Sequence, residues 1–326
     1  MFDIPVALIL FRRSDTLDRI ISRLREVKPQ KVYLLADCGR NEEEKKQSDY
    51  CRQLAESLID WDCEVVKHYA DENRGVYKNI GEGAKWVFER EERAIIIEDD
   101  NLPEVTFFRY AKELLEKYKD DERIGWICGT NYYTDMESDV SYKFTKHLLP
   151  CGWASWSHKF LKLYDGELET LGNPKLMRQF KKEYYPKLLR TYQLQSIRNE
   201  RFRFERTGKF VSWDFQMLWS IRSKGMYGIL PMRNQVTNIG VDSFSIHGGT
   251  SKEHEMTDKL CEIPSKPLDF PLIHPANVEV DKRCERMIGN VLCPSKKRVI
   301  RNVTSSKIKH MLGFDATLSW KRILKK

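Results

Sequence analysis

Three carboxylates stand side by side directly after an apolar run. Glu98, Asp99 and Asp100 follow the stretch 94–97, which reads Ala-Ile-Ile-Ile. Adjacent acids repel one another and lower stability unless a cation is present. Carboxylate oxygens suit Mg²⁺ or Mn²⁺ held jointly with a diphosphate. The pattern favours a divalent-metal site, and the competing interpretation is an acidic loop that solvates a strand end.

Two further strand ends carry charged residues. Arg12 and Arg13 follow the apolar run 5–10, and Asp37 follows the run 31–35. The arginines would supply a cation near a diphosphate or a base, or else are exposed charges after a strand. Asp37 would accept a hydrogen bond from an imide N–H, which favours uracil, or is simply a turn aspartate before Gly39.

The sequence pattern of the N-terminal half predicts the strands and helices that would position these residues. Apolar strands are predicted at 5–10, 31–35, 63–67 and 94–97, and segments of helical spacing lie between them at 16–27, 42–58 and 79–91. Continuous apolar strands alternating with helices indicate an α/β fold with a mainly parallel central sheet flanked by helices. Ligands of such sheets bind beyond the carboxyl ends of the strands, where the acidic triplet is expected.

The second half has a different composition. Residues 161–208 are rich in Lys, Arg, Tyr and Leu and have helical character with little β signal. Pro and Gly recur from Pro264 onward, so residues 256–326 are predicted to be a wrapping arm followed by a basic tail. That tail, Lys296 to Lys326, carries ten Lys and Arg against the single acid Asp315, a local charge of +9. The whole chain has a net charge of +8, so the part before the tail is close to neutral.

The motifs in their order resemble the GT-A glycosyltransferases. An apolar strand ending in E-D-D, followed by Phe107-Phe-Arg-Tyr110, is similar to their metal-binding motif. The closest resemblance is to the N-acetylglucosaminyltransferase type (alpha-mannoside beta-1,2-N-acetylglucosaminyltransferase) and to related bacterial sugar transferases. It spans about residues 4 to 250 and includes the strand and basic turn 5–13, the acidic strand end 36–39, the segment 73–78, the G-W motif 151–156 and the W-D segment 212–215.

The resemblance implies roles for single residues. Asp100 would ligate the metal, Asp99 would reach the ribose or a bound water, and Glu98 completes the metal–diphosphate site. The nucleotide pocket would include Asn73, Arg74 and Lys78.

Two later residues are candidates for chemistry. Asp214 would be the general base that deprotonates the acceptor hydroxyl, and one such base opposite the leaving group gives inversion; its alternative role is the N-cap of a helix over 215–222. His247 would face the metal or diphosphate, or is a loop histidine in a Gly-rich turn. Trp153 and Trp156 would stack on sugars or pack in the core.

The expected enzyme is an inverting, metal-dependent glycosyltransferase. Its GT-A domain would span 1–255, with a nucleotide-sugar-binding half at 1–135 and an acceptor half at 136–255. The donor would be a UDP-sugar, the cofactor Mn²⁺ or Mg²⁺, and the acceptor a glycan or lipid-linked glycan. The first alternative is a sugar-nucleotide nucleotidyltransferase, although the turn 11–15 lacks the glycines usual in those enzymes. The second is a non-catalytic carbohydrate- or nucleotide-binding protein of the same fold.

Composition bears on location. No apolar run approaches the roughly 20 residues that span a bilayer, and the stretch 4–11 is interpreted as a buried strand instead of a signal peptide. The eight cysteines have no CxxC spacing, so neither a zinc knuckle nor a thioredoxin motif is indicated. Without a signal peptide, reduced thiols in a cytoplasmic protein are expected. The tail would contact an anionic membrane at its inner face, or is merely solvated; its few aromatic residues argue against nucleic acid.

Overall fold

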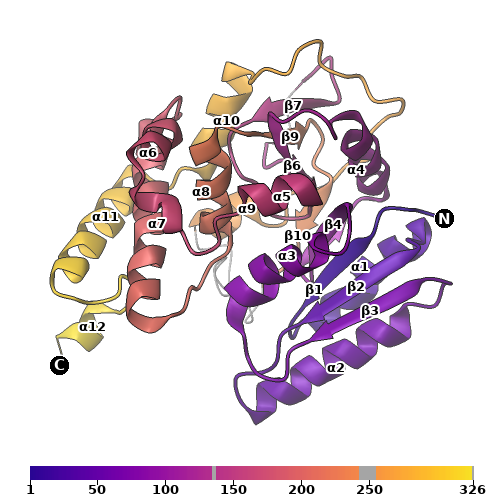
Figure 1. Cartoon of the computed structure of the whole chain (residues 1–326), viewed down its shortest axis with the longest axis horizontal. Helices are drawn as coiled ribbons and strands as arrows, with labels where there is room; N and C mark the ends of the chain where they lie inside the picture. The colour runs from indigo at the N-terminus through magenta and orange to yellow at the C-terminus, as the bar shows by residue number, and fades with distance from the viewer. Residues whose placement is uncertain (134–136, 242–254, 325–326) are drawn as a thin grey trace.

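The computed structural model describes residues 1–133, 137–241 and 255–324 (Figure 1). Its centre is an eight-stranded sheet in the order β3-β2-β1-β4-β8-β6-β9-β7. The strands are β1 (Val6–Leu10), β2 (Lys31–Ala36), β3 (Glu64–Tyr69), β4 (Arg93–Glu98), β6 (Ile124–Cys128), β7 (Tyr142–Thr145), β8 (Trp153–Trp156) and β9 (Tyr227–Pro231). A separate ribbon pairs β5 (Asn101–Pro103) with β10 (Val236–Asn238).

The N-terminal half of the sheet is parallel. Strands β3, β2, β1 and β4 pair in parallel register, so that their carboxyl ends share one edge. All five residues of β1 are buried, and alternate ones face opposite sides: Val6 belongs to one hydrophobic cluster and Ala7 to the other. A strand covered on both faces explains the continuous apolar run. The predicted fold class, a mainly parallel α/β sheet flanked by helices, is confirmed.

Helices cover both faces of this half. They are α1 (Ser14–Val27), α2 (Glu42–Leu58), the π-helical turn η1 (Tyr77–Glu82), α3 (Gly83–Phe88), α4 (Val105–Lys117) and α5 (Ser157–Leu163). Helix α1 buries Leu17, Ile20, Ile21 and Leu24, the helical spacing visible in the sequence.

Strand β8 differs from its neighbours because it lies antiparallel between β4 and β6, inside the sheet. It carries Trp153 and Trp156. Trp153 stacks on Trp126 with ring centroids 4.0 Å apart, and the Trp156 indole N–H donates to the Leu115 carbonyl at 2.8 Å. Both tryptophans are therefore core residues, and of the two interpretations the sugar-stacking one is wrong.

The remaining helices form a bundle beside the sheet. They are η2 (Glu169–Gly172), α6 (Pro174–Lys181), α7 (Lys187–Thr207), α8 (Asp214–Lys224), α9 (Glu255–Leu260), α10 (Lys282–Leu292), α11 (Lys296–Met311) and α12 (Trp320–Ile323). Figure 1 shows helix α11, in yellow, alongside α7 at the end of the molecule away from β3. The arm before α10 crosses the sheet edge, where Val280 bridges to Phe144 of β7. Most of the basic tail thus consists of packed helices. Among the described residues, no helix is long and apolar enough to span a membrane.

Candidate active site

A pocket of about 430 Å³ opens at the carboxyl ends of β1, β2 and β4. Its walls also include the loop before α8 and the residues after β10. The structure brings together there most of the residues singled out in the sequence: Arg12, Arg13, Asp37, Asn73, Glu98, Asp99, Asp100 and Asp214. All but Asp214 lie at or after the carboxyl ends of parallel strands, which share one edge. Asp214 reaches the pocket from the start of α8.

Asp99 is held in place by the turn after β1. Its Oδ2 accepts a hydrogen bond from the Phe11 backbone N–H at 2.8 Å, and its Oδ1 lies 3.4 Å from Arg13 Nη1. The Asp99 carbonyl accepts the Thr16 hydroxyl of α1. Burial raises the pKa of Asp99 to about 6, against the lowering effect of Arg13. Asp99 therefore joins β4 to the β1–α1 turn as well as lining the pocket.

Asp100 faces the same arginine and a close backbone. Its Oδ2 lies 3.4 Å from Arg13 Nη1, and its carbonyl accepts the Ile239 N–H at 2.8 Å. A Cβ on Gly240 would stand 2.6 Å from Asp100 Oδ2, so only glycine lets the chain after β10 pass this carboxylate. The segment that follows contains His247, which lies outside the described residues, and its role stays a prediction.

Glu98 and Asp214 complete a cluster of like charges. Burial, followed by the charges of Asp100, Asp99 and Asp214, raises the pKa of Glu98 well above its usual range, while Arg13 lowers it. The two acids reach one pocket from β4 and from the start of α8. With Asp99, Asp100 and Asp37 they bring five acids to the lining of one hollow, and a cation would relieve the repulsion among them.

The donor set fits a metal that arrives with its substrate. Within residues 1–133, 137–241 and 255–324, no group of three or more His, Cys, Asp and Glu side chains is arranged to hold a metal. Mg²⁺ usually takes one or two carboxylates plus substrate phosphates instead of a complete protein cage. Asp100, which lines the pocket beside Asp99, suits that mode of binding.

Asp37 is saturated by protein donors. Its Oδ1 accepts from the backbone N–H groups of Cys38 (2.9 Å) and Arg74 (2.7 Å). Its Oδ2 accepts from the Gly75 N–H (2.9 Å) and the Asn73 amide (3.0 Å). A carboxylate has about four acceptor positions, so a base could bond to Asp37 only by displacing one of these donors. In the structure Asp37 organises the turn 73–75 that forms one wall.

The basic residues predicted to line the nucleotide pocket divide into two groups. Arg13 faces the acids, and Arg12 lines the pocket while its Nη1 lies 2.9 Å from Glu44 Oε1. Arg74 Nη1 instead contacts His68 Nε2 at 3.0 Å, and Lys78 is exposed on η1; neither lines this pocket.

Sequence reasoning missed Asn79, the neighbour of Lys78. Asn79 is buried, lines the pocket, and donates to the Leu10 carbonyl at the end of β1 at 3.3 Å. The π-helical turn η1 sets this orientation. No pattern of residue types marked it, although π-helical turns occur often at functional sites.

Asp214 begins helix α8 and is not its N-cap. The N-cap is Trp213, which makes no side-chain capping bond and is nearly buried against Trp153, with ring centroids 5.8 Å apart. A carboxylate in the first turn is favoured by the helix dipole. Trp213 and the adjacent Phe210 and Val211 also line the pocket, and none of the three was singled out as a site residue in the sequence.

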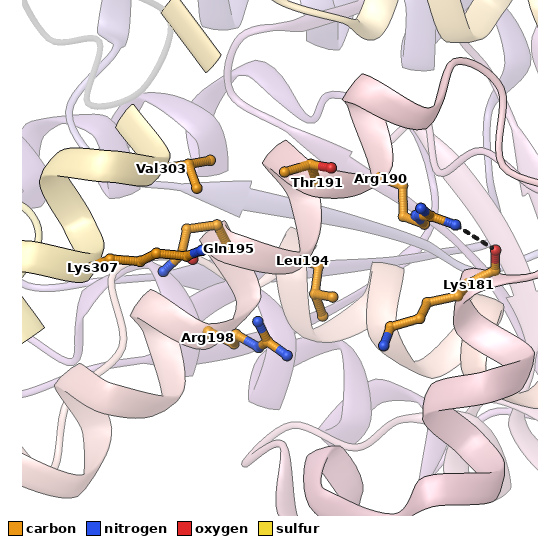
Figure 2. A pocket seen from close by; sticks show the side chains of 8 residues that line it. All are labelled: Lys181, Arg190, Thr191, Leu194, Gln195, Arg198, Val303 and Lys307. Carbon is orange, nitrogen blue, oxygen red and sulfur yellow. Dashed lines mark hydrogen bonds between the residues drawn. The ribbon is translucent and has the colours of Figure 1, made fainter. Parts of the chain in front are cut away.

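A second, cationic hollow of about 240 Å³ lies between α6, α7 and α11 (Figure 2). Its lining residues include four cations: Lys181, Arg190, Arg198 and Lys307. In the part of the chain that the structure describes, none of the four forms an ion pair with a carboxylate. The hollow shares no lining residue with the acidic pocket.

Comparison with known proteins finds only distant likenesses. No protein-family model and no curated protein matches the sequence. S. aureus TarS (residues 1–349) is 12% identical over 51% of this chain and 51% of its own length, with a TM-score of 0.37. A UDP-glucose pyrophosphorylase complexed with UDP-glucose is 10% identical over 74% and 94%, with a TM-score of 0.37.

A third likeness is glucosyl-3-phosphoglycerate synthase from Mycobacterium tuberculosis, whose structure contains Mn²⁺, uridine diphosphate and phosphoglyceric acid. It is 11% identical over 65% of this chain and 66% of its own, with a TM-score of 0.30. The chain spans about half the length of the TarS structure. Likenesses this weak assign no activity, which has to be argued from the pocket itself.

Proposed function

We propose that this chain is an inverting, metal-dependent glycosyltransferase of the GT-A kind that transfers a sugar from a UDP-sugar to a hydroxyl of a glycan or glycolipid. One observation carries the proposal: Glu98, Asp99 and Asp100 share a pocket with Asp214 at the carboxyl edge of a parallel sheet. Such a pocket would offer both a cation site for a diphosphate and a separate carboxylate for a proton.

The acidic triplet and Arg13 would bind the donor. Asp100 would ligate Mn²⁺ or Mg²⁺ together with the diphosphate, and Asp99, already anchored by the Phe11 N–H, would meet the ribose or a bound water. The bound ion would offset the charge that develops on the leaving diphosphate. Arg13 Nη1 lies 3.4 Å from Asp99 Oδ1 and from Asp100 Oδ2, and the guanidinium group would also form an ion pair with the phosphates.

Asp214 would act on the acceptor. An acceptor hydroxyl must lose its proton as it attacks the anomeric carbon, and a carboxylate within hydrogen-bond reach can take that proton. Attack from the side opposite the diphosphate inverts the anomeric centre. Position 214 suits this role because Asp214 lines the pocket and is the first residue of α8, whose N-cap is Trp213. The Asp214 side chain is therefore not needed to cap the helix.

The finer assignment follows the sequence resemblance. We propose an enzyme of the N-acetylglucosaminyltransferase type that works in the cytoplasm on a lipid-linked glycan or polysaccharide at an anionic membrane. Asn73 and the turn around Asp37 would shape the uridine site. His247 is retained as a second candidate metal ligand.

A direct test compares Asp100→Asn with the wild type. The substitution should abolish sugar transfer while leaving the melting temperature near that of the wild type, because it removes a metal ligand and relieves charge repulsion. Transfer is followed as release of UDP from UDP-N-acetylglucosamine and other UDP-sugars with Mn²⁺, with and without excess chelator. The matched control is Asp18→Asn, the same change at an exposed position of α1.

Two outcomes would contradict the proposal. Undiminished transfer by Asp100→Asn, or in excess chelator, would remove the metal site. Formation of UTP from UDP-sugar and pyrophosphate would identify a nucleotidyltransferase instead. Against that alternative, only residues 11–13 separate β1 from α1, and they include no glycine to cradle a triphosphate.

A further inference from the structure

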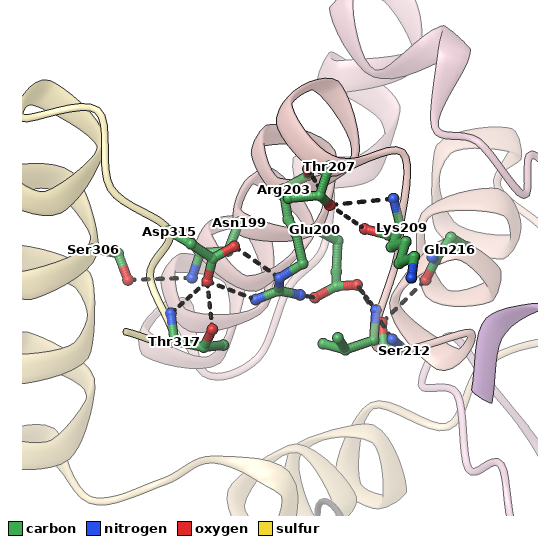
Figure 3. Close-up of polar contacts among 11 residues, drawn as sticks. Asn199, Glu200, Arg203, Thr207, Lys209, Ser212, Gln216, Ser306, Asp315 and Thr317 are labelled. Carbon is green, nitrogen blue, oxygen red and sulfur yellow. Dashed lines mark hydrogen bonds and ion pairs between the residues drawn. The ribbon is translucent and has the colours of Figure 1, made fainter. Parts of the chain in front are cut away.

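The loop that leads into Asp214 is held by a series of charged side chains from α7 and the C-terminal segment (Figure 3). Glu200 Oε2 accepts the backbone N–H groups of Val211 at 2.9 Å and Ser212 at 3.2 Å. Its other oxygen, Oε1, pairs with Arg203 Nη1. Arg203 then reaches Asp315 near the C-terminus, with Nε to Oδ2 at 2.8 Å and Nη2 to Oδ1 at 3.1 Å.

Two of these three charged side chains are buried, and Asp315 is half-buried. Glu200 is 4% exposed and Arg203 is 6% exposed. Burying a charge is costly unless its partners are present, and here both Glu200 oxygens and both ends of the Arg203 fork are occupied. Asp315 is itself fixed by the Thr317 backbone N–H at 2.7 Å. The three residues therefore form a continuous series of contacts from the segment after α11, through α7, to the loop before α8.

We propose that Glu200, Arg203 and Asp315 are positioning residues for Asp214, so that the C-terminal segment is a working part of the active site. The inference rests on the proposed role of Asp214 as the base. Glu200 holds two successive amides, two and three residues before Asp214, and so directs the chain as it enters α8. The same loop presents Phe210, Val211 and Trp213 to the pocket.

The expected consequence is a loss of turnover without a loss of donor binding. A displacement of about 1 Å can cost up to about a hundredfold in rate when a reacting group must be aligned. The donor site, built on β1, β2 and β4, does not touch Glu200 or Arg203 among the described contacts. A merely structural ion pair would lower stability and leave the turnover of the folded enzyme unchanged.

The test is a double-mutant cycle on the full chain. In Glu200→Gln the single oxygen can accept either the two amides or Arg203, and the NH2 group then faces the other partner. The variant should lower kcat by roughly 10- to 100-fold with little change in the dissociation constant of UDP with Mn²⁺. In an Asp214→Asn background the same change should cost almost nothing more, because residues that act as a unit are not additive. Glu205→Gln, on the exposed side of α7, is the matched control.

A second variant covers a folding failure of the first. Asp315→Asn weakens the pair with Arg203 while leaving Glu200 in place, and it should produce a smaller fall in kcat in the same direction. Arg203→Lys keeps the positive charge but loses the guanidinium group that bonds Glu200 and Asp315 together. Its kcat should lie between those of the wild type and Glu200→Gln.

The outcomes separate this inference from the proposed function. Full kcat in folded Glu200→Gln and Asp315→Asn, with Asp214→Asn inactive, would overturn the positioning role alone. An equal fold-loss of kcat from Glu200→Gln in the wild type and in the Asp214→Asn variant would also overturn the positioning role. Full transfer by Asp214→Asn would overturn the base role of Asp214 and with it the positioning inference, while leaving the proposed transferase activity in place.

Discussion

Burial and mutual repulsion destabilise the charged forms of the individual carboxylates in the pocket, and a cationic ligand would remove that destabilisation. The pKa values of Glu98 and Asp99 are both raised, first by burial and then by neighbouring acids. Arg13 is the cation that lies 3.4 Å from both Asp99 and Asp100. A divalent ion with a diphosphate would relieve the repulsion, so UDP with Mn²⁺ should raise the melting temperature more than UDP alone.

Asp214 permits a sharp test at the same scale. Asp214→Asn keeps the shape of the side chain but cannot take a proton at neutral pH, and it should lower turnover by about two to four orders of magnitude. The dissociation constant of UDP with Mn²⁺ and the melting temperature should stay near wild-type values. Initial rates with saturating acceptor, together with calorimetric titration of UDP, measure both quantities. An unstable variant that retains its specific activity would make the residue a helix-terminus contact instead of a base.

At the scale of elements, the turn 73–75 depends on one carboxylate. Asp37 takes three backbone N–H groups and the Asn73 amide, which tie the segment after β3 to the end of β2. Burial raises the pKa of Asp37, and its backbone hydrogen bonds counter that effect. The turn is thus shaped before any nucleotide binds, and preorganisation of this kind reduces the ordering cost of binding.

Asp37→Asn distinguishes a residue that shapes the turn from one that reads the base. An amide nitrogen in place of Oδ2 or Oδ1 cannot accept the N–H groups on that side, so the turn should loosen and all nucleotides should bind more weakly. The wild type should still prefer UDP to GDP and CDP, and the ratio of these affinities should be similar in the variant. A thermal-shift series with the three diphosphates in Mn²⁺ measures the ratio. If the preference for UDP disappears in Asp37→Asn, the carboxylate contacts the base directly.

Helix α10 docks on the sheet through a buried histidine. His147 Nε2 donates to the Glu285 carbonyl at 3.0 Å, and Glu285 Oε1 lies 3.7 Å from Arg222 of α8. Burial lowers the pKa of His147; Arg222 lowers it further, while Glu285 raises it. The Tyr184 ring packs edge-on to the imidazole. At neutral pH His147 is therefore an uncharged donor that connects the C-terminal arm to the segment after β7.

Stability should consequently fall with acidification below neutrality. The unfolded chain binds the proton near the ordinary histidine pKa of about 6.5, before the native state does, so stability present above that pH is lost as the pH falls below it. The contribution of one group is at most about 1.4 kcal/mol per pH unit. Urea unfolding at pH 7.5, 6.0 and 5.0 measures the free energy of unfolding. This free energy should fall less with pH in His147→Gln, which retains an N–H donor, than in the wild type. The exposed His158→Gln should match the wild type, and a wild-type slope in His147→Gln would contradict the assignment.

At the scale of the whole molecule, the positive charge is gathered on the helical bundle, and the acidic pocket lies at the sheet edge. The cationic hollow between α6, α7 and α11 joins residues from the middle of the chain to Lys307 of the basic segment (Figure 2). A concentrated positive field attracts anionic surfaces. We therefore locate the proposed membrane contact in this hollow and on α11, where basic residues would meet lipid phosphates.

Charge reversal tests this contact more cleanly than truncation, which would uncover the face of α7 that α11 covers. The pair Arg198→Glu and Lys307→Glu should weaken binding to phosphatidylglycerol-containing vesicles by at least about tenfold, since each basic residue near such a surface contributes about 1 kcal/mol. The loss should be largest at low salt, because screening acts over about 10 Å at 0.1 M ionic strength. Arg19→Glu with Lys46→Glu, both exposed on the N-terminal half, changes the net charge equally and is the control for vesicle sedimentation. Equal losses from both pairs would mean that only net charge matters.

The sequence by itself determined the parallel half of the sheet and one edge of the pocket. The apolar runs that became β1, β2 and β4, and the helical spacing of α1, are local patterns that depend on burial alone. Asp99, Asp100 and Arg13 could be placed together because parallel strands end at a common edge. The W-D segment also reached the same pocket, at Asp214.

Only the tertiary structure decided what each of these groups contacts. The saturation of Asp37, the inward turn of Asn79 in place of Lys78, and the burial of Trp153 inside the sheet all depend on partners distant in the chain. The basic C-terminal segment is the clearest case, since its composition is compatible with a solvated tail. Asp315, the one acid in that segment, pairs with Arg203 and through it reaches the loop before Asp214. A run of charges specifies where charge lies along the chain, whereas the partner of a buried ion pair is chosen by packing.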